Sequence, residues 1–356
     1  MEKSPKNTNG NPLAVKERTR LPKEQWCRQN YPIETDLKIK RVYQKEPIDT
    51  TCWAFMKLLR SRDKTRRVYP VDPYVEVYRF RENLYGLLTE SADGAGDSWM
   101  YLILGPEKAL LIDTSFGIGD LKGLVEELAP GKEVIVANTH GHFDHAYGNC
   151  QFEQVYCHKF EVPSLQKQDA HIWDYLFDEI TGQGIWSDFD RTDVVPFKPY
   201  EIIGCEDGHI FDLGSGYEVE LIHLGGHTPG HAGFLDKQNR IFFAGDDIVS
   251  MRTGVGGPRP GLAYGEHATI NTLCRQLKKM TERMDEYDHV FPSHFVTDLE
   301  NVAVQAMYEA CCAVLQDPVG SSHYSRGSGD GIRYFRYVEG LGTLSYTPRS
   351  VLEETE

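Results

Sequence analysis

The amino-acid sequence predicts an α/β fold, and three observations carry this prediction. Apolar runs of strand length alternate with segments of helical periodicity over most of the chain. A strand, a helix and a second strand follow one another between residues 109 and 137, which is the order of a βαβ-like unit. Four side chains of metal-binding type stand directly after the second of these strands. We therefore expect an α/β domain with a functional site at strand ends, where rigid scaffolding gives way to loops.

The first predicted elements lie before the cluster of metal-binding side chains. Alternating apolar residues predict a half-buried strand at 75–80. Apolar runs predict strands at 98–104 and 109–114, separated by a Gly-Pro turn. A helix is expected at 118–128, because its apolar residues recur on one face. The β-branched run at 134–137 predicts a buried strand.

The rest of the chain continues with strands and then helices. Four short runs broken by Gly, Asp and Asn predict a β meander at 208–246. Residues 159–190 are rich in aromatic side chains and are expected to be helical, with the rings either in the core or along a pocket. Further elements are expected as a strand at 155–158, helices at 267–284 and 299–315, and strands at 332–338 and 343–346.

Composition bounds the class of protein. The 356 residues carry a formal net charge of -15, which argues against a nucleic-acid partner. No apolar run approaches the roughly 18 residues of a membrane span. The first twenty residues are polar and contain no apolar signal segment. The eight cysteines show no CxxC spacing, so we expect reduced thiols and a cytoplasmic location.

The motif THGHFDH at residues 139–145 carries the chemistry. His140 and His142 alternate after a buried strand and can share one metal ion. Asp144 and His145 are adjacent, so they are better placed for a second ion. Imidazoles and a carboxylate suit Zn²⁺ first, with iron or manganese possible. The alternative is a polar loop with ordinary surface histidines.

Three later strand ends carry further ligand types. His227 lies in a Gly/Pro turn, Asp246 ends an apolar strand, and His294 follows a short strand. Taken singly, each is more often a structural histidine or a turn aspartate. Together with the first motif, four such junctions in one chain indicate a metal centre. His231, in the same turn as His227, has either a structural role or faces the substrate.

THGHFDH, GGHTPGH, AGD and PSH, in this order, resemble the motifs of the metallo-β-lactamase superfamily of metallohydrolases. The resemblance covers residues 74 to 348 approximately, and it implies a four-layer αβ/βα sandwich formed by residues 71–350. Residues 1–70 would be an N-terminal extension, partly disordered, which either packs on this domain or serves as a lid or a homo-oligomer contact. The resemblance implies one metal on His140, His142 and His227, a second on Asp144, His145 and His294, and Asp246 between them. Asp113 matches an acid of an early family motif and is expected to support the site.

This ligand set predicts a dinuclear metal-dependent hydrolase. A metal-bridged hydroxide would cleave an ester, lactone, thioester or amide bond of a small molecule, and Asp144 would orient the nucleophile and pass on its proton. One alternative is a mononuclear iron oxygenase of the same fold, similar to persulfide dioxygenases, which would use His140, His227 and Asp246. Another is a non-catalytic binding protein. The family's usual Pro-Gly-His-Gly is Pro-Ser-His-Phe here, which places Phe295 beside the site.

Substrate specificity is expected from the loop at 251–267, which follows Asp246. Four of its side chains could bind an anionic group or an oxyanion, and for each the alternative is an ordinary solvated loop position. These candidates are Arg252, Arg259, Tyr264 and His267.

Overall fold

The computed structural model describes residues 40–41, 60, 62–93, 96–189, 191–328 and 331–351. Most of the N-terminal extension expected over residues 1–70, including the disorder predicted within it, lies outside these ranges. Among the described helices, none combines the length and the apolar character needed to cross a membrane.

The first sheet has eight strands in the order β10-β8-β7-β6-β5-β4-β3-β2. Neighbours from β2 to β6 are antiparallel, whereas the pairs β6–β7, β7–β8 and β8–β10 are parallel. The parallel pairing of β6 with β7 is the one that the predicted βαβ unit requires. The strands are β2 (Arg67–Tyr69), β3 (Asp72–Arg81), β4 (Leu84–Thr89), β5 (Ser98–Leu104), β6 (Lys108–Ile112), β7 (Glu133–Ala137), β8 (Gln154–His158) and β10 (Glu201–Cys205).

The second sheet has six strands in the order β11-β12-β13-β14-β16-β17 and contains the predicted meander. The two sheets enclose an apolar core, in which Tyr101 of one sheet packs against Phe243 and Phe291 of the other. The strands are β11 (Ile210–Asp212), β12 (Glu218–His223), β13 (Ala232–Asp236), β14 (Ile241–Gly245), β16 (His289–Pro292) and β17 (Leu299–Glu300).

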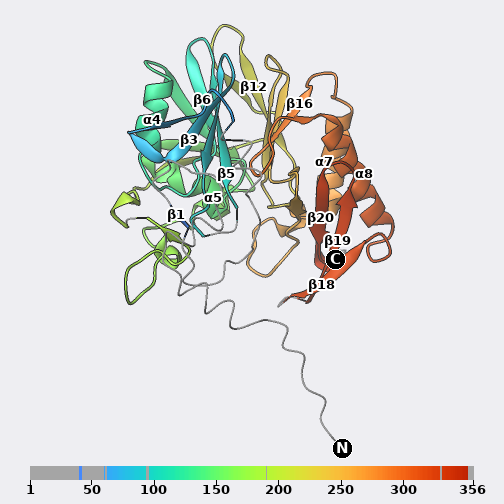
Figure 1. Ribbon diagram of the computed structural model, residues 1–356. Coiled ribbons are helices and arrows are strands. Elements are labelled where there is room, and N and C mark those ends of the chain that lie inside the picture. The colour runs from blue at the N-terminus through green and yellow to red at the C-terminus, as the bar shows by residue number, and fades with distance from the viewer. Residues whose placement is uncertain are drawn as a thin grey trace, which may run out of the picture.

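Helices cover the outer face of each sheet, as Figure 1 shows with α4 on one side and α7 and α8 on the other. Leu124 and Val125 of α4 are fully buried against the first sheet. Leu277 of α7 and Met307 of α8 are buried in a core shared with the second sheet. The predicted four-layer αβ/βα sandwich is therefore confirmed. The helices are α4 (Leu121–Leu128), α7 (Ile270–Thr281) and α8 (Val302–Gln316).

Side-chain caps set the starts of two helices. Asp120 accepts a hydrogen bond from the Gly123 amide, so α4 begins three residues later than its apolar periodicity suggests. Thr269 accepts one from the Thr272 amide and starts α7 in the same way.

A smaller sheet has the order β15-β20-β19-β18, in which β18, β19 and β20 follow α8, and it confirms the two strands predicted near the C-terminal end. Val338 and Leu344 of this sheet are buried in the same core as α7 and α8. The sheet thus packs on the outer helical layer, and β20 lies between β15 and β19. Its strands are β15 (Arg252–Gly254), β18 (Tyr324–Ser328), β19 (Gly331–Val338) and β20 (Gly342–Tyr346).

The helical prediction for residues 159–190 is wrong for most of its length. Among the described residues 159–189, only α6 (Val162–Leu165) and the short 3₁₀ turn Asp174–Leu176 are helical, and Ser187–Asp188 pairs with Lys40–Arg41. Asp178 accepts hydrogen bonds from two following backbone amides, which favours a turn over a helix. The indole of Trp173 is buried and donates to the carbonyl of Phe116, so this ring belongs to the core.

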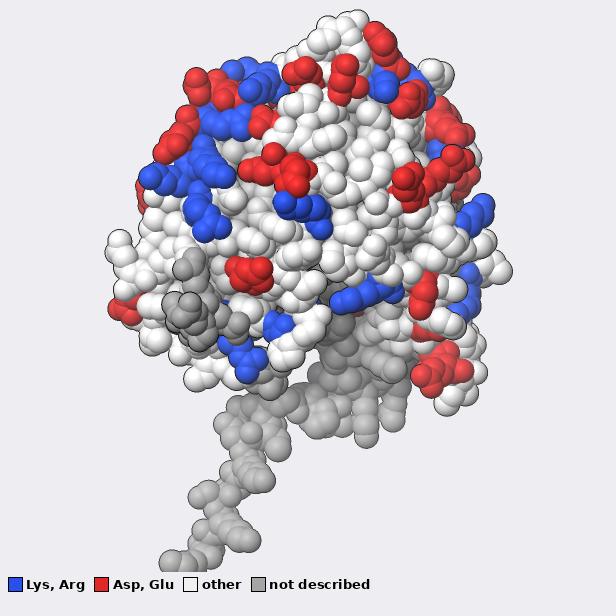
Figure 2. All heavy atoms as spheres, turned by 180° about the vertical axis from the view of Figure 1, so that it is seen from behind, with Lys and Arg blue, Asp and Glu red and all other residues white. Residues whose placement is uncertain are grey.

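One face of the molecule carries charges of both signs. In Figure 2, Asp and Glu side chains lie beside Lys and Arg side chains, mainly in the upper part of this face. This face differs from the clustered basic face that binding to a phosphate backbone requires.

Candidate metal centre

All seven predicted ligands meet at one edge of the two sheets. His140 and His142 lie in the loop after β7, and Asp144 and His145 lie in the single helical turn α5 (Phe143–Ala146) that follows. His227 comes from the β12–β13 loop, Asp246 follows β14 and His294 follows β16. Strand ends of both sheets therefore supply the site.

The first group of ligand types consists of three histidines. The Nδ1 atom of His142 lies 3.0 Å from Nε2 of His140 and 3.0 Å from Nε2 of His227. The Nδ1 atom of His227 donates to the carbonyl of Gly254 at 2.6 Å, and the Nδ1 atom of His140 contacts the hydroxyl of Thr139 at 3.0 Å. Because the Nδ1 atom of each ring then carries the proton, the Nε2 atoms of both rings present lone pairs to the site. A proton on Nδ1 of His142 can bond to the lone pair of only one of these two Nε2 atoms. The three nitrogens are therefore better satisfied by a bound cation.

The second group is Asp144, His145 and His294. The Nε2 atoms of the two histidines face each other at 3.3 Å. Their outer nitrogens are already bonded, because His145 donates to Asp113 at 3.1 Å and His294 donates to the carbonyl of Asp97 at 2.7 Å. Two inward lone pairs at this separation repel unless a positive charge lies with them. Oδ2 of Asp144 is 3.2 Å from Nε2 of His294 and completes this group.

Asp246 lies between the two groups. Its Oδ2 is 3.5 Å from Nε2 of His227 and 3.3 Å from Nε2 of His294. Its Oδ1 is buried, has no hydrogen-bond partner in the structure, and lies 3.6 Å from Nε2 of His145. A buried carboxylate oxygen without a donor is costly, and a cation held by these side chains removes that cost.

Protonation in this centre follows the charges that face each group. Burial lowers the pKa of His140 and His227, and burial together with His227 lowers the pKa of His142 to about 3. These three imidazoles are therefore neutral, as metal ligands must be. Burial opposes charge on His294 as well, but Asp246 and Asp144 outweigh it and raise the pKa of His294 to about 10. The two carboxylates thus attract positive charge to the second group.

Supporting residues hold the ligands in place. Asp113, in a left-handed conformation with φ 65° after β6, accepts hydrogen bonds from the amide and the hydroxyl of Thr139 as well as from His145. This is the supporting position expected for it. His231 is fully buried, accepts from the amide of Asp246 at 2.9 Å and contacts Asp247 at 2.7 Å. Of its two predicted roles, this geometry favours the structural one.

A cavity of about 370 Å³ opens onto Asp144, Asp246 and His294. Arg252 and Phe295 line it, so one predicted substrate-binding residue and the unusual Phe of the last motif both border the centre. Phe295 adopts φ 65°, a conformation in which a side chain is strained and which glycine would adopt freely.

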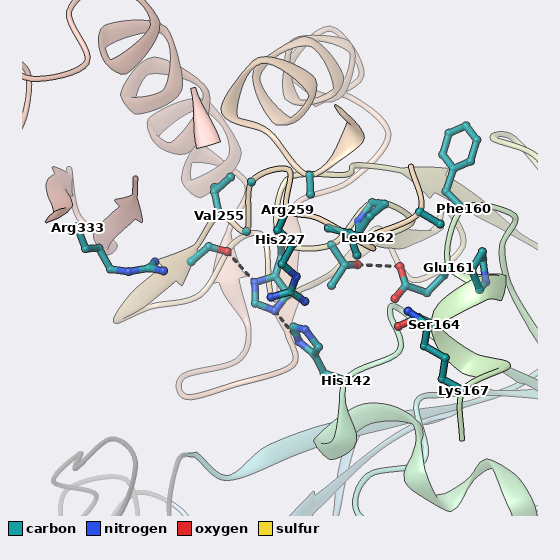
Figure 3. A pocket seen from close by; sticks show the side chains of 18 residues that line it. His142, Phe160, Glu161, Ser164, Lys167, His227, Val255, Arg259, Leu262 and Arg333 are labelled. Carbon is teal, nitrogen blue, oxygen red and sulfur yellow. Dashed lines mark hydrogen bonds between the residues drawn. The ribbon is translucent and has the colours of Figure 1, made fainter. Parts of the chain in front are cut away.

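A second cavity of about 220 Å³ adjoins the first and shares His142 and His227 with it (Figure 3). Arg259 lines this second cavity. Tyr264 and His267 line neither cavity; they pack against Phe160, whose ring stacks on His267 at a centroid distance of 4.2 Å. Two of the four predicted substrate residues thus border a cavity and two lie behind its wall.

The structure also brings in residues that no motif indicated. The buried carboxylate of Glu161 accepts from the Gly141 amide and from the Thr228 hydroxyl, and so ties the first histidine loop to the second. Lys167 borders the second cavity, and Arg333 of β19 borders both. These residues lie far from the ligand motifs in sequence, so only the folded chain reveals them.

Comparisons with known proteins identify one family model and several similar proteins. The family model described as the metallo-β-lactamase superfamily matches residues 93–294. A hydroxyacylglutathione hydrolase (GloC) of Haemophilus influenzae is 31% identical over 175 residues, which cover 49% of this chain and 76% of that protein. The human acyl-coenzyme A thioesterase MBLAC2 is 27% identical over 222 residues, which cover 56% of this chain and 73% of that protein. The crystal structure of the DIM-1 metallo-β-lactamase aligns with a TM-score of 0.46 and 19% identity, over 68% of this chain and 99% of that one.

The chain belongs to the metallo-β-lactamase superfamily, because the family model matches more than half of its residues. It is a metal-dependent hydrolase of this superfamily.

Proposed function

We propose that this protein is a dinuclear metal-dependent hydrolase of small-molecule thioesters. The observation that carries the proposal is the convergence of two groups of ligand atoms on Asp246, with one buried oxygen of that carboxylate lacking a donor. The choice of a thioester among ester, lactone, thioester and amide follows from the two relatives, whose names describe a glutathione thioester hydrolase and an acyl-coenzyme A thioesterase.

We assign His140, His142 and His227 to one ion and Asp144, His145 and His294 to the other, with Asp246 between them. Three imidazole nitrogens, and two imidazoles with a carboxylate, favour Zn²⁺, with Mn²⁺ or Fe²⁺ as alternatives. When bound, such ions lower the pKa of a coordinated water from about 15.7 towards about 7 and polarise a carbonyl oxygen.

The chain's own residues would prepare and complete the reaction. Asp144 turns Oδ2 towards His294, which leaves its other oxygen to orient the attacking water and accept a proton from it. The water oxygen then bonds to the thioester carbon, the C–S bond breaks with its electron pair on sulfur, and the proton passes from Asp144 to the thiolate. Arg252 and Arg259 would bind the substrate from the two cavities, while Tyr264 and His267 would support the wall at Phe160.

The test is metal content per chain by mass spectrometry, with hydrolysis of acylglutathione, acyl-coenzyme A, ester, lactone and β-lactam substrates measured alongside. We expect about two ions per chain in the wild type and turnover of at least one thioester. Asp246→Ala is expected to bind fewer ions and to lose at least about 100-fold in kcat/KM. Asp285→Ala, which removes an exposed carboxylate outside the centre, is the matched control and is expected to resemble the wild type.

One iron per chain without hydrolysis of any of these substrates would overturn the proposal in favour of the mononuclear oxygenase. Purified protein without bound metal would favour the non-catalytic alternative. A homo-oligomer, a cytoplasmic location and the division into residues 1–70 and 71–350 stay predictions. Strand β2 (Arg67–Tyr69) lies before that division and pairs with β3 of the first sheet.

A further inference from the structure

The small C-terminal sheet places arginines at the rim of the metal centre. Arg252 of β15 and Arg333 of β19 line the same cavity as Asp144, Asp246 and His294. Strand β20 lies between β15 and β19, and its Ser345 lines the cavity as well and accepts a hydrogen bond from Nη1 of Arg333 at 3.3 Å. Arg333 lies beyond the segment that the family model matches, which ends at residue 294.

These arginines gather positive charge at the cavity, although the chain as a whole carries a net charge of -15. Arg326 pairs directly with Arg333 in the β18–β19 register, and like charges in that position destabilise a strand pair. Among the described residues, Arg333 forms no ion pair with a carboxylate. Burial lowers the pKa of Arg252, and the charges of Arg333 and Arg326 lower it further. Arg333 is therefore repelled by its neighbours and is stabilised by an anion placed beside it.

The shape of the site directs this charge towards a substrate. Arg333 borders both cavities, and Figure 3 shows its side chain extending towards His227, with Lys167 on the far side of the two histidines. An anion held at Arg333 is therefore next to the ligands of the proposed centre. A guanidinium binds carboxylates and phosphates through two parallel hydrogen bonds, which also orient the bound molecule.

We infer that Arg252 and Arg333 form an anion-binding subsite, which takes a carboxylate or a phosphate of the substrate and sets its position relative to the centre. This inference rests on the proposed thioester hydrolysis for its catalytic meaning but not for the binding itself. The anion has two possible sources, the acyl part of the thioester or its thiol part, and both present the same chemistry to the two arginines.

The experiment compares wild type, Arg333→Gln and Arg326→Gln on matched substrates. Arg326→Gln removes the same charge from the neighbouring strand, at a position that does not line the cavity, and so controls for the general field. Succinyl and 4-methylpentanoyl thioesters of one thiol test an anion on the acyl part, because a carboxylate and an isopropyl group are similar in shape. Thioesters of one acyl group with coenzyme A and with pantetheine test an anion on the thiol part, because coenzyme A carries phosphates that pantetheine lacks.

For one of these pairs we expect Arg333→Gln to reduce kcat/KM on the charged member by about 10- to 100-fold, mainly through KM, as the loss of charge-assisted hydrogen bonds predicts. The neutral member and the Arg326→Gln enzyme should change little. The subsite would be overturned if kcat/KM fell equally on the charged and neutral members. It would also be overturned if kcat/KM fell equally in both variants, or did not fall at all.

Binding without turnover separates this inference from the proposed function. Calorimetric titration of the metal-loaded protein with coenzyme A, pantetheine and succinate should show tighter binding of an anionic probe by the wild type than by Arg333→Gln. If no thioester is hydrolysed but this difference is present, the proposed function fails and the subsite stands. If thioesters are hydrolysed and anionic probes bind both proteins alike, or bind neither, the subsite fails and the proposed function stands.

Discussion

Two arginine environments at opposite ends of the described chain differ in how their charge is balanced. Arg60 is 6% exposed, and its guanidinium lies 3.0 Å from Glu76, 3.5 Å from Glu90 and 3.2 Å from Asp97. Arg333 is half-buried beside other arginines and, within the described ranges, pairs with no carboxylate. One region surrounds a cation with acids, whereas the other gathers cations around a cavity.

The difference separates a charge that maintains structure from a charge available to a ligand. Burial alone would lower the pKa of Arg60, but Glu76 and Asp97 raise it above its ordinary value, so the buried ion stays charged. Asp97 also offers its backbone carbonyl to His294, so Arg60 fixes a loop that holds a proposed metal ligand. Because Arg333 has no carboxylate partner within the described ranges, its charge is available to an anion instead.

The largest effect is expected from Arg60→Met, which removes the buried cation that Glu76, Glu90 and Asp97 share, although Arg66 still contacts Glu76 at 3.1 Å. We expect the free energy of unfolding to fall by about 3–5 kcal/mol, the usual cost of breaking a buried ion pair from one side. Urea denaturation measures it, and metal content should fall as well, because the support of His294 is weakened. The exposed Arg62→Met is the control and should stay near the wild type. A loss below about 1 kcal/mol would mean that Arg60 contributes little to the balance.

Asp72 sharpens the comparison, because it is a buried carboxylate without a cation among the described residues. Oδ1 accepts from the Tyr74 amide and Oδ2 has no hydrogen-bond partner, and burial raises the pKa of Asp72 to about 7. The folded state therefore holds a proton that the unfolded state releases near pH 4. This contribution to stability is complete below about pH 4 and is lost as the pH rises to about 7.

Asp72→Asn keeps the carbonyl acceptor and cannot ionise, so it should remove this pH dependence. Between pH 5 and pH 8 the variant should gain stability relative to the wild type by an amount on the order of 1–4 kcal/mol. Unfolding curves at several pH values measure the difference, with the exposed Asp285→Asn as control. Parallel pH profiles of wild type and Asp72→Asn would show that Asp72 is charged in the folded protein throughout this range.

The smallest effect on stability is expected from Arg333→Gln. The variant loses one hydrogen bond to Ser345 and also some repulsion from Arg252 and Arg326, so the free energy of unfolding should change by no more than about 0.5 kcal/mol. Thermal denaturation of wild type and variant checks this. A loss of unfolding free energy comparable to that of Arg60→Met would show that Arg333 maintains the structure rather than binding a ligand.

Much of the fold was predictable because its signals are local. The apolar period of α4 and the β-branched run of β7 each match the structure to within a few residues. The segment 159–190 was not predictable in this way, because its aromatic residues resemble a helix face in sequence. Their partners, such as the carbonyl of Phe116 for Trp173, come from distant parts of the chain and decide the conformation.

The sequence by itself determined the family motifs and their order, because each ligand type stands at the end of a recognisable strand. Only the tertiary structure decided how close the ligand atoms lie, that His231 supports Asp246, and that Tyr264 and His267 lie behind Phe160. It also decided that Arg60 reaches Asp97 and that Arg333 reaches the cavity. These contacts join residues that lie between 15 and more than 100 positions apart, and they arise from sheet register and layer packing, which no local pattern of residues specifies.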